Sequence, residues 1–303
     1  AEVENLTSDE NGTVTLYAQW KASTYKIVYD KNNANAKGSI PDTKATYDVA
    51  LIIGKCSYTL DGYTFTEWNT APDGTGTSYP AGMEVTNLCD KNGDKIILYA
   101  QWTANTYSIT YNKNSSKATG AMASQIFRYD TAMKLSKNTY SYTGYLFDGW
   151  NTQSDGSGTA YVDEQEVNNI TSSDKATIIL YAQWKPITYT VHFHSGADDA
   201  SGSMANQTFT YDQATTLMLN TFEKIGYQFA GWATQEGNST IAYTDGEAVK
   251  NLANTDKATV DLYAVWGGIT YYVAFDGNES TSGSMSNITL NYDAVQTLPK
   301  STF

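Results

Sequence analysis

The chain has 303 residues, of which 41% are hydrophobic, and it carries a formal net charge of −13 at pH 7. Basic residues are outnumbered by acidic ones and form no patch, so nucleic acid is not an expected partner. No apolar run approaches the roughly 18 residues of a membrane-spanning helix, so the sequence predicts no membrane span. The mild acidity is typical of a surface that keeps a protein in solution.

One five-residue segment recurs four times along the chain. It reads Leu-Tyr-Ala-Gln-Trp at 16–20, 98–102 and 180–184, and Leu-Tyr-Ala-Val-Trp at 262–266. Successive copies start 82 residues apart, and a fixed period of this size indicates a tandem array. The period predicts whole repeats at 21–102, 103–184 and 185–266, a closing fragment of a repeat at 1–20, and an opening fragment at 267–303.

Each repeat is predicted to open with a strand that starts at a Thr-Tyr pair. In the first whole repeat, alternation places Tyr25, Ile27 and Tyr29 on one apolar face. A polar loop over 30–37 separates this strand from a second one that leads into a Tyr-Asp pair at 47–48. The simplest interpretation is an antiparallel hairpin.

The second half of the repeat is predicted to contain two more strands. The strand 62–68 precedes Asp73-Gly74, a dipeptide that tolerates positive φ and favours a hairpin turn. The final strand, 96–102, places apolar residues on one face. Between them, residues 81–88 and the matching segment 164–170 are predicted to form a short helix or helical turn. The expected fold class is therefore mostly β, with at most one short helix in each repeat.

All seven tryptophans fall at just two positions of the repeat, at the ends of the third and final strands. This pattern predicts a structural role in the core. The predicted core tryptophans are Trp20, Trp68, Trp102, Trp150, Trp184, Trp232 and Trp266. An exposed aromatic platform for sugars is the less favoured interpretation, because most of the aromatic residues recur at alternating core positions.

These landmarks, taken in order, resemble a known family. The segment Tyr-Leu-Phe-Asp-Gly-Trp-Asn-Thr at 145–152, the Asp-Gly-Ser-Gly-Thr turn at 155–159 and the closing strand 180–184 are similar to the Listeria–Bacteroides repeat, the B-repeat type of internalin B. The resemblance implies β-grasp-like modules in tandem on secreted or wall-attached bacterial proteins, hence an extracellular location at the cell surface. It implies no catalytic residue and no cofactor. Glu67 departs from the pattern, which has Gly there, and 233–237 departs from the Asn-Thr-x-x-Asp-Gly turn.

Cys56 and Cys89 lie in the same repeat, and the other repeats have no cysteine at the matching positions. Their joint occurrence suggests a disulfide, which would stabilise the fold by roughly 3–4 kcal/mol in the chain-entropy model. An extracellular setting would permit it. Two unpaired thiols are the main alternative, and redox or metal chemistry is a third.

Other candidate metal ligands are sparse. His192 and His194 are the only histidines and share one face of a predicted strand, a spacing that could offer two metal ligands. Because Val191 and Phe193 hold the core-facing positions, both histidines point outward, and a solvated pair is the favoured interpretation. Each Asp-Gly turn has one Asp, too few carboxylates for a calcium loop. No metal site is predicted.

The sequence leaves two functional classes open. The first is a non-catalytic stalk or spacer that projects another domain, with the adjacent repeats of the same chain as its partners. The alternative is a multivalent adhesin module that binds a host-surface or cell-wall ligand, protein or glycan, through repeated weak sites. Such a binder needs the same exposed residues in every repeat, yet one outward position holds Lys26, Ser108, Thr190 and Tyr272 in turn. The variation favours the spacer, and an enzyme is not expected.

The fragments at the two ends lack parts of a repeat. Together they supply the last 20 and the first 37 positions, without the Gly-Tyr-x-Phe-x-Gly-Trp strand. Neither can close a domain, so we expect the sequence to lie within a longer continuous array.

Overall fold

The computed structural model describes residues 2–303. The chain divides into two compact units. The first comprises Ala1–Ile109, Ser124–Leu135 and Glu166–Ile178, and the second comprises Thr110–Ala123, Ser136–Gln165 and Ile179–Phe303. The two units are defined by contacts between residues and not by the 82-residue period, so the predicted repeat boundaries remain a prediction.

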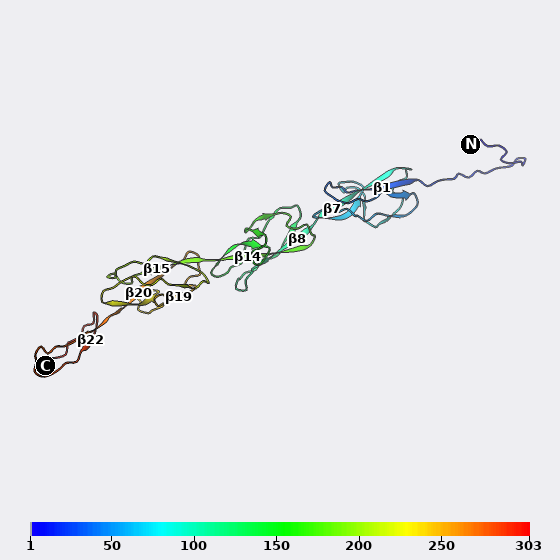
Figure 1. Cartoon of the computed structure of the whole chain (residues 1–303). Coiled ribbons are helices and arrows are strands. Elements are labelled where there is room, and N and C mark those ends of the chain that lie inside the picture. The colour runs from blue at the N-terminus through cyan, green and yellow to red at the C-terminus, as the bar shows by residue number, and fades with distance from the viewer. Residues whose placement is uncertain (1) are drawn as a thin grey trace. The chain divides into compact units, whose positions relative to one another are not determined.

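The first unit contains a five-stranded sheet with the order β2-β1-β7-β4-β5. Its strands are β1 (Thr24–Asp30), β2 (Thr43–Thr46), β4 (Tyr63–Asn69), β5 (Ser78–Tyr79) and β7 (Lys95–Ala104). The first and last strands, β1 and β7, which are labelled in Figure 1, run parallel to each other. Every other neighbouring pair of this sheet is antiparallel. A ribbon of β3 (Leu51–Ile52) and β6 (Glu84–Val85) completes the set. The predicted hairpins β1–β2 and β4–β5 are confirmed.

Alternation in β1 and β7 places their apolar side chains in one core. The buried members are Tyr25, Ile27 and Tyr29 of β1 and Leu98 and Ala100 of β7. Trp68 at the end of β4 is completely buried, with its ring 4.8 Å from that of Tyr29 and 5.0 Å from that of Phe65. Burying such large aromatic surfaces is the main stabilising contribution in a module of this size, at about 25 cal/mol per Å² of apolar surface.

The next repeat uses the same elements. These are β8 (Thr106–Asn112), β9 (Gln125–Arg128), β10 (Met133–Lys134), β11 (Tyr145–Asn151), β12 (Ala160–Tyr161), β13 (Glu166–Val167) and β14 (Ala176–Pro186). In the first unit β8 pairs with β9 and β10 with β13, and in the second unit β11 pairs with β12 and β14. All these pairs are antiparallel, as in the preceding repeat.

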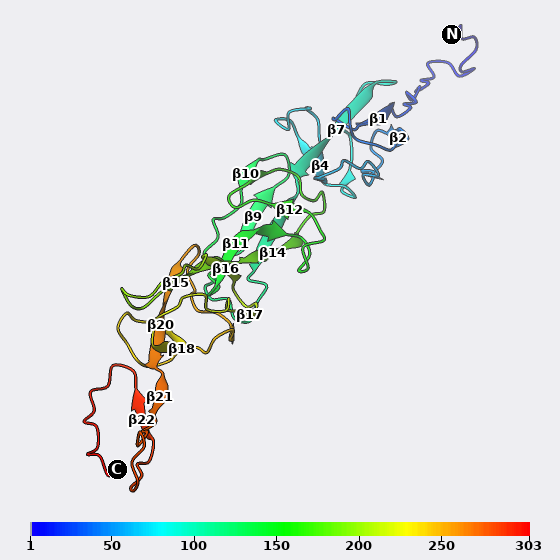
Figure 2. The same cartoon turned by 60° about the vertical axis from the view of Figure 1, so that its left-hand side comes forward.

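The second unit also holds the third repeat. Its strands are β15 (Thr188–His194), β16 (Gln207–Thr210), β17 (Thr215–Thr216), β18 (Tyr227–Ala233), β19 (Ala248–Val249) and β20 (Thr259–Gly268). The sheet order is β16-β15-β20-β18, with β15 parallel to β20. Beyond it lies an antiparallel hairpin of β21 (Thr270–Val273) and β22 (Ile288–Asn291), which Figure 2 shows as a direct continuation of β20.

No helix occurs among the described residues, so the fold is mostly β as predicted, but the short helices expected at 81–88 and 164–170 are wrong. These segments contain the strands β6 and β13 instead. Asn87 and Asn169 follow them with φ values of 55° and 53°, a left-handed conformation that a right-handed helix cannot continue. The Asn87 carboxamide oxygen accepts a 2.6 Å hydrogen bond from the backbone N–H of Asp48, which ties the segment to the hairpin.

The seven tryptophans have three different environments. Trp68, Trp150 and Trp232 are at most 1% exposed. Trp102, Trp184 and Trp266 are half-buried, and each indole N–H donates to a backbone carbonyl, of Lys31, Lys113 and Ser195 respectively. Trp20 departs from the predicted core role, because its side chain is 92% exposed. The final strand of a repeat is buried by pairing with earlier strands of that repeat, and residues 2–20 have no such partner in the structure.

We expect Trp68→Ala to destabilise the first whole repeat by about 3–5 kcal/mol, because it removes a fully buried indole and leaves a cavity. Hydrogen–deuterium exchange over residues 24–104 would then become faster. Trp20→Ala is the control, since loss of an exposed side chain should change stability by no more than about 0.5 kcal/mol. Equal exchange in the two variants would contradict the core role of Trp68.

Candidate functional site: the junctions between repeats

The final strand of one repeat runs almost directly into the first strand of the next. Asn105 alone separates β7 from β8, Ile187 alone separates β14 from β15, and Ile269 alone separates β20 from β21. We call these three positions the linker residues. A linker of one residue adds only two soft backbone torsions between the strands that it joins.

Backbone hydrogen bonds hold each linker residue from both sides. The N–H of Asn105 donates to the Gly62 carbonyl at 2.8 Å, and the Asn105 carbonyl accepts from the Tyr129 N–H at 2.9 Å. The same two bonds join Ile187 to Gly144 and Tyr211, both at 3.0 Å, and Ile269 to Gly226 and Tyr292, both at 2.9 Å. One bond comes from the preceding repeat and the other from the following one, so both backbone groups of the linker are satisfied.

The glycine that accepts from the linker must lack a side chain. Gly62 has a φ of 78°, and a Cβ atom there would lie 2.2 Å from the ring of Tyr129. The same closeness occurs between Gly144 and Tyr211, and between Gly226 and Tyr292. Because the tyrosine belongs to the next repeat, this contact sets how closely two neighbouring repeats approach each other.

A side-chain hydrogen bond crosses the same boundary. The hydroxyl of Tyr63 donates to the Asp130 carboxylate at 2.8 Å. Tyr145 donates likewise to Asp212 at 2.9 Å, and Tyr227 to Asp293 at 2.8 Å. We call these the Tyr–Asp contacts. In the first two, an asparagine of the acceptor's repeat also holds the carboxylate: Asn169 donates to Asp130 at 2.6 Å, and Asn251 to Asp212 at 2.9 Å.

The charges of the central Tyr–Asp contact are set by these partners. Hydrogen bonds from the Asn251 side chain and then from Tyr145 lower the pKa of Asp212 to about 2. Burial, followed by the hydrogen bond to Asp212, raises the pKa of Tyr145 to about 12. The Lys250 ammonium lies 3.3 Å from the same carboxylate. A neutral phenol therefore faces a charged carboxylate over a wide range of pH.

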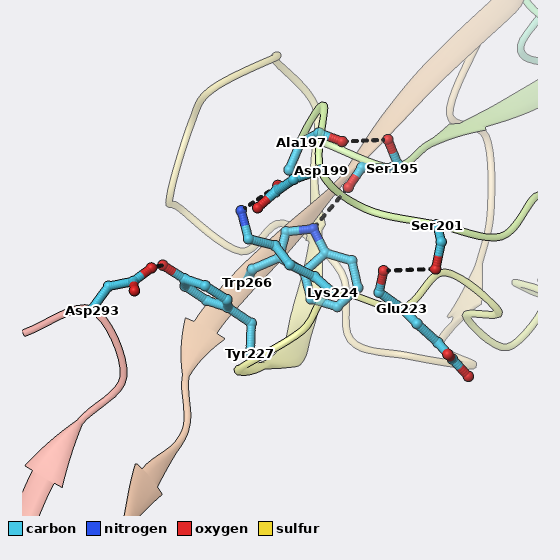
Figure 3. A network of polar contacts seen from close by, with 9 residues as sticks. All are labelled: Ser195, Ala197, Asp199, Ser201, Glu223, Lys224, Tyr227, Trp266 and Asp293. Carbon is cyan, nitrogen blue, oxygen red and sulfur yellow. Dashed lines mark hydrogen bonds and ion pairs between the residues drawn. The ribbon is translucent and has the colours of Figure 1, made fainter.

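The third junction carries an additional cation, which Figure 3 shows beside the Tyr–Asp contact. Lys224 lies 4.5 Å from the centre of the Tyr227 ring and 2.7 Å from the Asp199 carboxylate. The ammonium thus contacts the face of the ring whose hydroxyl donates to Asp293. Leu60 and Tyr142 occupy the matching positions of the other repeats, so this cation is specific to the third repeat.

The linker side chain varies while its backbone contacts do not. The Asn105 carboxamide accepts from the Thr64 hydroxyl at 2.6 Å and donates to the Ser172 carbonyl at 2.8 Å. Ile187 is 2% exposed and fills the matching position with apolar surface. Either chemistry satisfies the position, because the amide has hydrogen-bond partners and the aliphatic chain needs none.

The sequence pattern predicts these residues but not their association. Gly-Tyr opens the third strand of a repeat and Tyr-Asp closes the second, so in the sequence they are separate landmarks. In the structure the Gly-Tyr of one repeat meets the Tyr-Asp of the next, 67 residues later for Tyr63 and Asp130. The nearly constant offset between the two landmarks, 67 residues at the first two junctions and 66 at the third, is the signal that could have linked them.

The cysteines differ from the disulfide hypothesis. Cys56 and Cys89 are free thiols. The sulfur of Cys56 lies 3.8 Å from the Tyr58 carbonyl oxygen, and that of Cys89 lies 3.8 Å from the Lys91 carbonyl oxygen. Each thiol thus has a backbone acceptor two residues further along the chain. Burial also raises the pKa of the Cys56 thiol, which disfavours the reactive thiolate.

The outward-facing residues that were considered as candidate metal ligands make local contacts instead. His194 lies 2.8 Å from the Asp261 carboxylate of the neighbouring strand, and His192 lies 3.9 Å from it. The Asp73 carboxylate accepts from the backbone N–H and the hydroxyl of Thr75, so it closes its own turn. Within residues 2–303, no group of three or more His, Cys, Asp or Glu side chains is placed to hold a metal ion.

Comparison with known proteins identifies the repeats. The sequence model of the Listeria–Bacteroides repeat domain matches residues 25–101, 107–183 and 189–265. The chain belongs to the Listeria–Bacteroides repeat family. Each match begins 82 residues after the previous one, in step with the period of the closing strands.

Two curated relatives come from Evansella cellulosilytica. The chain is 31% identical over 252 residues to a putative Gly-rich membrane protein. The aligned region covers 83% of this chain and 27% of the relative. The chain is 24% identical over 267 residues to a second relative, a putative membrane protein. This aligned region covers 88% of the chain and 36% of that relative. The chain thus spans about a third or less of the length of these relatives. Within residues 2–303, the structure holds no helix with the length and hydropathy that a membrane crossing needs.

Similarity to solved structures is weak. The Bacillus anthracis TIE protein aligns with a TM-score of 0.30 and 9% identity, over 81% of this chain and 50% of that one. The pilus adhesin SpaC from Lactobacillus rhamnosus GG aligns with a TM-score of 0.19 and 13% identity, over 82% and 44%.

We expect Gly62→Ala to loosen the first junction, because the new methyl group would overlap the Tyr129 ring. The matched control is Gly82→Ala in the same repeat, where φ is also positive, at 83°, but no atom lies within 4 Å of the added Cβ. Both variants bear the backbone strain of an L-residue in this conformation, roughly 1–2 kcal/mol. Hydrogen exchange at the Asn105 and Tyr129 amides should accelerate more in Gly62→Ala, and the same rate in both variants would refute the steric argument.

The Tyr–Asp contact of Tyr145 should stabilise the protein within defined pH limits. Because the pKa of Asp212 is lowered in the folded protein, its carboxylate contributes fully to the stability of the fold at pH values above the ordinary pKa of 3.8. This contribution to stability is lost as the pH falls toward about 2. Because the pKa of Tyr145 is raised in the folded protein, its neutral phenol contributes fully to the stability of the fold at pH values below the ordinary pKa of 10.0. This contribution to stability is lost as the pH rises toward about 12.

The measurement is the difference in Tm between wild type and Tyr145→Phe as a function of pH. It should be constant from about pH 5 to 9, and shrink below about pH 4 and above about pH 10. Tyr17→Phe, at an 81% exposed side chain, should leave Tm unchanged throughout. A difference that persists unchanged at pH 2 would show that Asp212 is not the acceptor that matters.

Proposed function

We propose that this chain is a non-catalytic spacer segment of a bacterial surface or secreted protein, located outside the cell, which projects another domain. The observation that carries the proposal is the junction. In three copies, one linker residue, two backbone hydrogen bonds, a glycine–ring contact and a Tyr–Asp contact join one repeat to the next. A joint held at several points resists bending, which is the property that a spacer requires.

The family and the relatives support the surface location. The chain consists largely of Listeria–Bacteroides repeats, and the two Evansella relatives are described as putative membrane proteins. The strand arrangement, with the first and last strands parallel at the centre of the sheet, supports a β-grasp-like module without its helix. The residues of the junctions serve as contacts between repeats, so the partners of each repeat are its neighbours in the chain.

A multivalent adhesin for a host-surface or cell-wall ligand is the competing function. It requires a shared exposed feature, and the outward side of the first strand carries Lys26, Ser108 and Thr190 at one equivalent position. No catalytic group or cofactor enters either proposal. The junctions, which are the same in all three copies, therefore favour the spacer.

Spin-label distance measurements across the first junction test the spacer. Labels would be attached at Ser57→Cys and Lys134→Cys, two exposed positions in successive repeats, with the native thiols replaced by the residues of the next repeat, Cys56→Asn and Cys89→Thr. We expect a narrow distance distribution, and a much broader one after a Gly-Gly-Ser insertion next to Asn105. An equally broad distribution without the insertion would rule out a stiff joint.

A further inference from the structure

The third repeat lacks an asparagine that bridges three segments in each of the first two repeats. The Asn32 amide nitrogen donates to the Pro72 carbonyl at 2.7 Å and to the Ala100 carbonyl at 3.0 Å. Asn114 makes the matching two bonds at the same distances in the second repeat. Each asparagine therefore joins the polar loop after the first strand to the turn after the third strand and to the final strand.

A glutamine on the final strand reaches the same turn. The Gln101 amide nitrogen lies 3.3 Å from the Ala71 carbonyl oxygen and 3.4 Å from that of Pro72. The amide nitrogen of Gln183 lies 3.5 Å from the Gln153 carbonyl oxygen. Two amide side chains thus cross the space between loop, turn and final strand in each of these repeats.

Glycine and valine replace these two amides in the third repeat, at Gly196 and Val265. Gly196 has a φ of 66°, near the values of 51° and 55° at the two asparagines, so the left-handed conformation is kept and only the side chain is lost. The carbonyls of Glu236 and Ala264 match the acceptors of the asparagine in the other repeats. In the third repeat they receive no hydrogen bond from side chains at these two positions, and an unmatched acceptor favours a ligand that brings a donor.

A cavity of about 230 Å³ lies at this place, and we call it the third-repeat cavity. Gly196 and Val265 are part of its lining, together with three half-buried aromatic residues, Tyr227, Tyr263 and Trp266. Cavities for drug-sized ligands measure about 300–1,000 Å³, so this one suits a single small unit of a larger molecule.

One of the aromatic rings is held in place by a histidine. The His194 ring stacks on the Tyr263 ring, with centroids 4.7 Å apart and an interplanar angle of 16°. His194 in turn lies 2.8 Å from the Asp261 carboxylate. Asp30 and Asn112 occupy the matching positions of the first two repeats, so this stacked ring is particular to the third repeat.

We propose that the third-repeat cavity binds an N-acetylhexosamine residue of a glycan. The acetamido N–H supplies the amide donor that Gly196 and Val265 do not. The aromatic rings offer apolar surface to the C–H groups of the sugar ring, while Lys224, Asn238 and Ser239 add polar groups to the lining for its hydroxyls.

The lining favours a sugar over a peptide. A peptide N–H brings the same donor, but it lies between two further residues of a continuous chain. An acetamido group projects from its sugar ring, so it can enter a small cavity while the ring packs on an aromatic side chain. A single site in one repeat also differs from the repeated sites of a multivalent adhesin, so the inference goes beyond the spacer proposal and does not depend on it.

Saturation-transfer difference NMR and titrations on the whole chain test the proposal. N,N′-diacetylchitobiose should bind, with saturation reaching its acetamido methyl protons. Cellobiose, which has hydroxyls in place of the acetamido groups, should bind roughly tenfold more weakly or less, because it lacks the amide donor. Equal binding of the two sugars, binding of neither, or tighter binding of N-acetylasparagine amide would overturn the proposal.

Two variants locate the binding in the cavity. Val265→Gln introduces the glutamine of the first two repeats and should weaken diacetylchitobiose binding roughly tenfold, because its amide occupies the turn. Tyr263→Leu should weaken it as well, because the stacked ring is lost. The matched control is Val265→Thr, which keeps the size of the side chain and should keep the affinity. Binding that is unchanged in both Val265→Gln and Tyr263→Leu would show that the sugar lies elsewhere.

The sugar has two sources, the bacterial cell wall and a host surface. Titrations with the disaccharide of N-acetylglucosamine and N-acetylmuramic acid, and with N-acetyllactosamine, distinguish them. Tighter binding of the first assigns the wall as the source, and tighter binding of the second assigns the host. The spin-label experiment measures the first junction, whose residues are unchanged in these variants, so the two proposals fail separately.

Discussion

The contact between a glycine backbone and a tyrosine ring of the next repeat is the constraint on which the junctions depend. At Gly62 the chain needs a positive φ and has no room for a Cβ atom against Tyr129. This closeness brings the Gly62 carbonyl to the Asn105 N–H and the Tyr63 hydroxyl to Asp130. A side chain at the glycine would separate all of these pairs, because they occupy one small area of surface.

The core of each repeat and the junctions between repeats have different structural roles. The core residues of each repeat come from alternating strand positions and stabilise that repeat by burial, as Trp68 and Leu98 do. The junction works mainly through directional hydrogen bonds, which fix an orientation more than they add stability. This is why the linker can be a polar Asn105 or an apolar Ile187 without a change in its backbone contacts.

The sequence predicted what is periodic and local, and failed where a contact crosses a repeat boundary or depends on a single backbone conformation. Alternation identified Tyr25, Ile27 and Tyr29 as core residues, because a strand presents every second side chain to one face. The helix expected at 81–88 fails at Asn87, whose left-handed conformation is fixed by its bonds to Asp48. The predicted core role of Trp20 is wrong because a repeat position indicates only that a side chain can be buried, whereas burial itself needs the partner strands. The Tyr–Asp contacts were missed because their members belong to different repeats.

The three cores differ in one hydrogen bond, that of the buried indole at the end of the third strand. The Trp68 indole N–H donates to the Gly54 carbonyl at 3.0 Å, whereas among the described residues the buried N–H groups of Trp150 and Trp232 find no acceptor. A buried donor without an acceptor costs about 1–3 kcal/mol, so the Trp68 indole is the best satisfied of the three. The Tyr–Asp hydrogen bonds, by contrast, stay between 2.8 and 2.9 Å in all three copies. The contacts that recur at all three junctions therefore vary less than this core hydrogen bond, as the proposed spacer role requires.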